Sequence, residues 1–226
     1  MDRNGLRRAI VRASAAGALA LAICALPPGR AAAQDRVALS FVSGGAFYSQ
    51  SEKTEHAIDP QIFVYDGLVA VGTGPQRIEH IAGLRNARLD DALASPLYNA
   101  EGMALGLTLR KWLAARGVLE TQTQANGRIR WIASFKHLVP FGTYSLFAQS
   151  AGADAEKTFR PLDADGSASS FEAGADGSAM IVLETSPRVA DETAIVLVYH
   201  SDGREHGVSR GRLGVTAHEQ LAARLN

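Results

Sequence analysis

Turn-forming dipeptides divide this 226-residue chain into short apolar runs. An Asp-Gly or Asn-Gly pair supplies the positive φ angles that a tight turn between two strands requires. Such pairs stand at Asp66-Gly67, Asn126-Gly127, Asp165-Gly166, Asp176-Gly177 and Asp202-Gly203. No segment keeps a helical period for long. The pattern predicts a mainly β fold, an antiparallel β-sandwich or a jelly-roll-like meander.

The clearest predicted hairpin joins residues 118–124 to residues 128–138 through Asn126-Gly127. In its second arm apolar and mostly polar residues alternate, which is typical of a strand with one buried face, so we expect Trp131 in the core. A second hairpin is predicted from residues 62–65 and 68–71 around Asp66-Gly67. Further strands are expected at 157–162, 168–172, 178–184 and 194–200.

One segment breaks the β pattern, because Leu109, Trp112 and Leu113 follow a helical spacing. It predicts one short amphipathic helix packed on the sheet over 109–116, with Thr108 as its cap and Gly117 at its end. The C-terminal residues allow two predictions. Thr216 and Glu219 form a capping-box pattern that favours a terminal helix over 220–225, whereas residues 215–225 also suit an edge strand.

The first 33 residues have the order of a secretory signal peptide: basic residues, an apolar stretch over 13–26, and small residues over 31–33. The apolar stretch is shorter than the roughly 20 residues that span a bilayer. We therefore expect an exported protein, periplasmic or extracellular, with one β-sandwich domain over 34–226. The alternative is an uncleaved N-terminal anchor. Arg7 and Arg8 leave both the Sec and the twin-arginine route open, and Ile23 argues against lipidation of Cys24.

Removing residues 1–33 takes away five of the 23 basic and one of the 23 acidic residues, which leaves 18 and 22, a formal balance of −4. A mildly acidic domain without a clustered basic face argues against a nucleic-acid partner. Cys24, the single cysteine, is removed with the same segment. The mature fold is therefore expected to have no disulfide, thiolate nucleophile or cysteine metal ligand.

Three local motifs suggest chemistry but have simpler interpretations. Gly207-Val-Ser209-Arg-Gly211 matches the serine-hydrolase nucleophile elbow, yet the expected surroundings are strand and loop, and the acid and the histidine do not follow in the required order. Gly72-Thr-Gly74 lacks the third glycine of a dinucleotide loop. Asp163-Ala-Asp165-Gly166 resembles the start of a calcium loop, but Gly174 stands at the twelfth position, so a hairpin turn is the better interpretation.

The most concentrated polar cluster holds three of the six histidines. His200 ends an apolar strand, His206 lies just past the Asp202-Gly203 turn, and His218 follows within 19 residues. Imidazole and carboxylate ligands suit zinc or copper. The sequence therefore predicts a candidate metal site at His200, Asp202, His206 and His218, with Glu205 as a second possible acid. Histidines at strand ends also often hydrogen-bond backbone groups, which is the structural alternative.

Three segments resemble exported β proteins that have no assigned activity: Gly142-Thr-Tyr-Ser-Leu-Phe147, Pro161–Gly166 with Phe171, and Tyr199–Gly203 leading to His206-Gly207 and His218. The resemblance spans the last two-thirds of the mature chain. It implies a secreted β-sandwich and transfers no catalytic residue.

These observations lead to a preferred function and two alternatives. We expect a non-enzymatic domain that binds a ligand, glycan or protein through loops at one end of the sandwich. Tyr48, Tyr98 and Phe141 are candidate contacts, although the favoured interpretation of each is a loop anchor that packs on the core. The alternatives are a metal-binding domain or metalloenzyme using the histidine cluster, and a serine hydrolase using Ser209.

Overall fold

The computed structural model describes residues 36–151, 157–163, 165–186 and 192–225. The protein is mainly β, as predicted, with antiparallel sheets and two short α-helices in the described part of the chain. The helices are α1 (Gly44–Glu52), α2 (Leu109–Ala114) and the 3-10 turn η1 (Pro75–Arg77). The strands are β1 (Arg36–Ser40), β2 (Val42–Ser43), β3 (Ile58–Tyr65), β4 (Gly72–Thr73), β5 (Glu79–His80), β6 (Leu84–Arg88), β7 (Pro96–Tyr98), β8 (Ala104–Thr108), β9 (Arg116–Thr123), β10 (Ile129–Lys136), β11 (Thr143–Ala151), β12 (Lys157–Pro161), β13 (Ser170–Glu172), β14 (Ala179–Thr185), β15 (Glu192–His200) and β16 (Ala217–Arg224).

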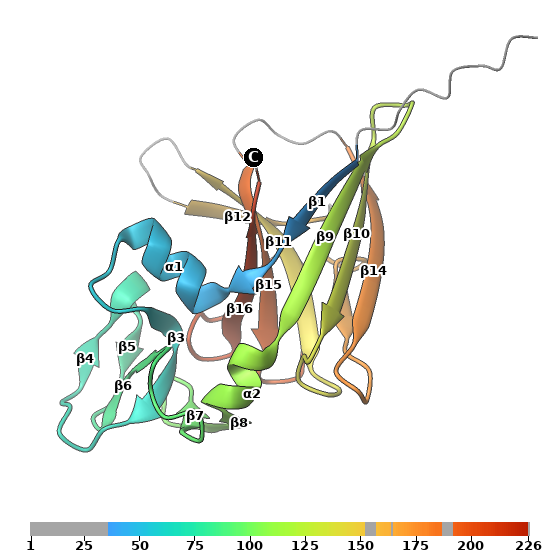
Figure 1. Cartoon of the computed structure of the whole chain (residues 1–226). Coiled ribbons are helices and arrows are strands. Elements are labelled where there is room, and N and C mark those ends of the chain that lie inside the picture. Colours follow the sequence, from blue (N-terminus) through green and yellow to red (C-terminus); the bar gives the residue numbers. More distant parts are fainter. Residues whose placement is uncertain (1–35, 152–156, 164, 187–191, 226) are drawn as a thin grey trace, which may run out of the picture. The chain divides into compact units, whose positions relative to one another are not determined.

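Two larger sheets form the sandwich (Figure 1). One has the strand order β1-β9-β10-β14, and the other has the order β12-β11-β15-β16-β2 with β13 beside β11. The main apolar core draws on both sheets, with Leu119 and Trp131 from the first and Leu146, Leu197 and Leu221 from the second. Alternating side chains thus make one buried face on each sheet.

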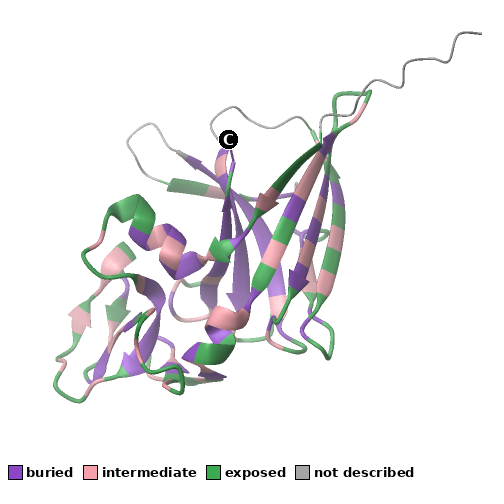
Figure 2. Cartoon of the chain, viewed as in Figure 1, coloured by how far each residue is buried: buried purple, intermediate pink, exposed green. Residues whose placement is uncertain are grey.

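The two sheets differ in how far they are buried (Figure 2). Strands β9 and β10 alternate between buried and exposed residues, whereas β15 is buried along almost its whole length. The second face of β15 packs against another apolar cluster, in which Val196 and Val198 meet Phe47 of α1. The continuous apolar run of β15 is explained by this burial on both faces.

A smaller sheet, with the order β6-β3-β7-β8, and the β4-β5 pair have a separate core around Phe63, Ile78 and Leu84. Hydrogen bonds tie this sheet to the sandwich. Asp59 of β3 accepts a hydrogen bond from the Trp112 indole, and the backbone oxygen of Gln61 contacts the His218 ring. Among the described residues, no helix is both long and apolar enough to cross a membrane.

Several elements confirm the sequence predictions. Strands β9 and β10 pair around the Asn126-Gly127 turn, where Gly127 has a φ of 77°. Trp131 is buried, and its indole donates to Thr185 Oγ1 at 2.8 Å. Helix α2 follows Thr108 as expected, although it ends at Ala114, before Gly117, and the Thr108 side chain makes no capping hydrogen bond.

The preferred prediction for the C-terminus was wrong, because residues 217–224 form strand β16 and no helix. This strand pairs with β15 on one side and with β2 on the other, so it lies inside the sheet. The two capping-box residues have other partners: Thr216 Oγ1 accepts from the Arg212 amide, and Glu219 pairs with Arg210. Sheet pairing and burial on both faces outweigh the local helix signal.

The hairpin predicted around Asp66-Gly67 was also wrong in its second arm. Residues 62–65 belong to β3, but residues 68–71 form no strand, and Tyr65 pairs with Leu84 of β6. The Asp66 backbone oxygen accepts from the Val69 amide, and the Asp66 amide donates to Gly83. The chain therefore forms a loop after Asp66, and the strand that pairs with this end of β3 is β6, which begins at Leu84. Sequence analysis also missed α1, whose N-cap Ser43 accepts from the Ala46 amide.

Candidate functional site

The candidate site is built on the loop of residues 201–216, which joins the ends of β15 and β16. The loop is anchored at its base, where the Ser201 amide donates to the Thr216 backbone oxygen at 2.9 Å. The second half of the loop is held by Arg210. Its guanidinium lies 3.2 Å from the centre of the Phe159 ring and pairs with the Glu219 carboxylate. These contacts fix both strand ends and give the intervening polar side chains a defined place.

His200 ends β15 and is buried, with 1% of its surface exposed. Its Nε2 atom lies 2.9 Å from Ser145 Oγ on the neighbouring strand β11, while its Nδ1 atom is buried and has no hydrogen-bond partner. Burial, together with the nearby His206, lowers the pKa of His200 to about 4. The ring is therefore neutral at pH 7.

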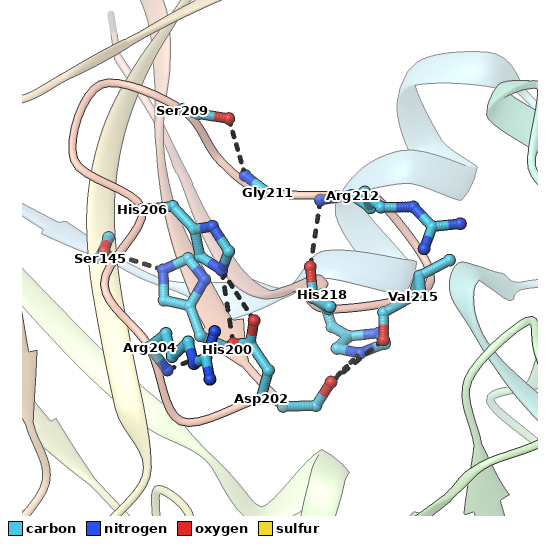
Figure 3. A network of polar contacts seen from close by, with 12 residues as sticks. Ser145, His200, Asp202, Arg204, His206, Ser209, Gly211, Arg212, Val215 and His218 are labelled. Carbon is cyan, nitrogen blue, oxygen red and sulfur yellow. Dashed lines mark hydrogen bonds and ion pairs between the residues drawn. The ribbon is translucent and has the colours of Figure 1, made fainter.

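His206 and Asp202 lie directly beside His200 (Figure 3). The centres of the His200 and His206 rings are 5.0 Å apart. His206 Nε2 contacts Asp202 Oδ2 at 3.1 Å, and both side chains are about one-quarter exposed. Glu205 is exposed and is not in this group. The structure thus brings three of the predicted site residues together.

His218 is not available to that group. It is fully buried on β16, its Nδ1 atom lies 2.9 Å from the Gln61 backbone oxygen, and its Nε2 atom lies 3.1 Å from Ser201 Oγ. Since a backbone oxygen only accepts, the Nδ1 atom carries the proton. Burial lowers the pKa of His218 to about 4, so the ring is neutral and its Nε2 atom is the acceptor that faces Ser201 Oγ. The single hydroxyl proton of Ser201 is shared between this nitrogen and the Val215 backbone oxygen, which lies 3.2 Å away. Both nitrogens are occupied, which matches the structural alternative considered for strand-end histidines.

The other sequence motifs have structural roles. Ser209 Oγ accepts from the Gly211 amide at 3.1 Å, in a loop rather than between a strand and a helix. Asp165 Oδ1 accepts from both the amide and the hydroxyl of Ser167, and Asp176 does the same with Ser178. These are Asx turns. Among the described side chains, no three or more His, Cys, Asp or Glu groups already form an arrangement that could hold a metal ion.

Two of the three aromatic residues predicted as loop contacts lie elsewhere. Tyr48 is half-buried in α1, and Tyr98 of β7 packs on the small core. Phe141 is 65% exposed in a loop, as expected, and its backbone has a left-handed φ of 57°. Tyr98 therefore has the core-anchor role that the sequence favoured, and Phe141 is the one of the three that lies exposed in a loop.

Sequence analysis missed an apolar loop surface, which we define as Tyr65, Leu68, Val71 and Ile81. Their exposed fractions are 73%, 97%, 73% and 47%. The loop that carries them is fixed, because the Asp66 amide donates to Gly83 O at 2.8 Å and the Gly83 amide donates to Val69 O at 2.7 Å. The available signal was the uncharged stretch 67–76, of which the hairpin prediction had assigned residues 68–71 to a strand.

A second missed feature is the hydroxyl pair beside His200. Ser145 Oγ lies 2.8 Å from Ser170 Oγ, and Ser170 Oγ donates to the Gly166 backbone oxygen at 2.8 Å. Serines are common in strands and loops, so no local pattern marked them.

Comparison of this chain with family models, with curated proteins and with solved structures finds no match.

Proposed function

We propose that this protein is an exported, non-enzymatic β-sandwich domain that binds a protein partner through the apolar loop surface. The observation that carries the proposal is Leu68, whose side chain is 97% exposed at the tip of a hydrogen-bonded loop. An exposed apolar side chain gains free energy only when another surface covers it. A loop already held in one conformation loses little entropy on docking.

The composition of the surface favours a protein over a glycan. Three of its four side chains are aliphatic, and the stretch 67–76 carries no charge. Glycan sites combine aromatic platforms with directed polar groups, whereas apolar side chains at the centre of a contact are typical of protein interfaces. The acidic balance expected for the mature chain leaves protein as the preferred partner class over nucleic acid.

The export part of the proposal depends on the predicted signal peptide, which lies outside the described residues. Fusing residues 1–40 to a reporter that is active only after export tests it. Reporter activity is expected with the native segment. Activity is expected to be lost when two aspartates replace apolar residues within 13–26. Reporter activity that does not depend on the segment would contradict export.

A photo-crosslinking amino acid at position 68 tests the binding surface, with position 125 as the control. Ala125 is exposed in the β9–β10 turn, on a different sheet from the apolar loop surface. We expect one partner protein to be crosslinked from position 68 only. The purified partner should then bind Leu68→Ser about tenfold more weakly than the wild type, with Thr73→Ser as the matched control. Equal crosslinking from both positions, or equal affinity of Leu68→Ser and the wild type, would contradict the proposal.

A further inference from the structure

The protonation state of His200 follows from counting the protons along three hydrogen bonds. A serine hydroxyl has one proton to donate. Ser170 donates its proton to the Gly166 backbone oxygen, which can only accept. Ser145 must then donate its own proton to Ser170, and Ser145 can only accept from His200 Nε2. The opposite direction would break the bond to Gly166, so this order is the only one that keeps all three bonds.

His200 is therefore the tautomer with its proton on Nε2, and its Nδ1 atom carries a bare lone pair. That atom is buried and has no hydrogen-bond donor near enough to use it. A buried acceptor without a donor is costly, and such an atom in a native protein calls for a physical explanation. A bound cation is one, because metal-ligating histidines usually donate the other ring N–H to a neighbouring group. His200 already makes that bond to Ser145.

Two further candidate metal ligands, His206 and Asp202, lie beside the His200 ring, and the centres of the two imidazole rings are 5.0 Å apart. In Figure 3 the His200 ring lies between Ser145 on one side and His206 with Asp202 on the other. His206 is about one-quarter exposed, and Gly211, which has no side chain, lies beside its ring: a Cβ atom there would be 3.3 Å from His206 Nε2. Two imidazoles and one carboxylate, with positions left open, are a ligand set for divalent transition metals.

We propose that His200 Nδ1 and His206 Nε2 bind one zinc or copper(II) ion, with the Asp202 carboxylate as the third ligand. The described side chains do not hold this arrangement in advance, so His206 must give up its contact with Asp202 and turn toward the ion. Because the Asp202 carboxylate can only accept, His206 Nε2 carries the ring proton in that contact, and this proton must move to Nδ1 before Nε2 can bind the ion. His218 is excluded, since Gln61 and Ser201 occupy both of its nitrogens. The inference is independent of the apolar loop surface.

Calorimetric titration of the purified protein with zinc and with copper(II), after removal of bound metal, tests the site. We expect about one equivalent of at least one ion to bind. His206→Ala should weaken binding at least tenfold, and the exposed His137→Ala should leave it unchanged. Since His206 is partly exposed, its replacement is expected to keep the fold, and a far-ultraviolet circular dichroism spectrum equal to that of the wild type checks this.

Ser145→Ala supplies a readout that a simple loss of ligand does not. Without the Ser145 acceptor the tautomer of His200 is no longer fixed, so we expect affinity to fall about tenfold while the stoichiometry stays at one. The proposal is overturned by less than a tenth of an equivalent of either ion in the wild type. Equal affinity of the wild type and His206→Ala would overturn it as well.

Discussion

The indole Nε1 of Trp112 donates a hydrogen bond to Oδ2 of Asp59 at 2.9 Å, and both residues are almost completely buried. The bond connects α2 to β3. The second carboxylate oxygen of Asp59 accepts from the Gln61 amide at 3.0 Å. A buried carboxylate is thus satisfied from two elements, and it holds the small sheet against the sandwich.

Replacing Trp112 with Phe should therefore destabilise the protein by about 1–3 kcal/mol, because it leaves one oxygen of a buried carboxylate without its donor. Trp131→Phe is the matched control, since its indole donates to the neutral, partly exposed Thr185 hydroxyl. The control should lose about 1 kcal/mol. Urea unfolding of both variants measures the difference. Equal losses would show that the carboxylate does not need the indole.

The pH dependence of stability should reveal Asp59. Burial raises its pKa to about 6, with nearby Glu219 adding to the rise. Between pH 3.8 and 6 the folded state therefore holds a proton that the unfolded state has lost, so Asp59 makes stability rise as the pH falls. A second contribution, from His200 and His218, has the opposite direction, because their folded pKa values of about 4 lie below 6.5, and it is lost as the pH falls from 6.5 toward 4.

Asp59→Asn removes the first contribution and leaves the second. Its unfolding free energy should therefore fall more steeply than that of the wild type between pH 6 and 4, by up to about 1.4 kcal/mol per pH unit. The slopes of the two stability curves are compared rather than the absolute free energies. The reason is that the new side-chain amide faces the same backbone donor as the carboxylate did, which changes the stability of the variant at every pH. Urea titrations at half-unit pH steps give both curves. Parallel curves would contradict the assignment.

Gly44 should tolerate no side chain. A Cβ atom there would lie 1.8 Å from the backbone oxygen of Glu219, so α1 could stay on β16 only if one of them moved. Gly44→Ala is expected to cost more than about 3 kcal/mol or to prevent folding. Gly106→Ala is the control, as nothing lies near its Cβ position. Its φ of 69° predicts a loss of about 1–2 kcal/mol. Thermal melts of the two variants decide the matter.

The Arg210–Glu219 pair should be strongly coupled, because both side chains are less than one-fifth exposed. Arg210→Met leaves a largely buried carboxylate unpaired and should cost about 3 kcal/mol. Glu219→Gln in the same chain should recover at least about 1 kcal/mol of that loss. A double-mutant cycle from urea unfolding measures the coupling. Additive losses would mean that the pair contributes no interaction of its own.

The sequence was a good guide wherever structure is local. Asn126-Gly127 and its alternating arms sufficed to predict β9 and β10, because the turn and the pattern of burial agree. The β fold class and the position of α2 followed in the same way. His200, Asp202 and His206 were placed together because the end of β15 and the turn that follows it carry all three.

The failures came from pairings between distant parts of the chain. Tyr65 pairs with Leu84 rather than with its near neighbours, and residues 217–224 are drawn into the sheet by β15 and β2. The tautomer of the His200 ring depends on hydrogen bonds with Ser145 and Ser170, which lie on other strands. His218 shared the local spacing of the cluster, but Gln61 from another sheet occupies its ring. No window of sequence contains these partners.

The position of β16 between β15 and β2 also affects the order of events during synthesis. Ser43 pairs with Leu221, so β2 and α1 leave the ribosome long before the strand on which they pack. The sandwich cannot close until that late strand is available, and contacts between such distant residues form slowly. The domain can therefore complete its fold only after residues 217–224 have been synthesised, so folding of this chain is largely a post-translational event.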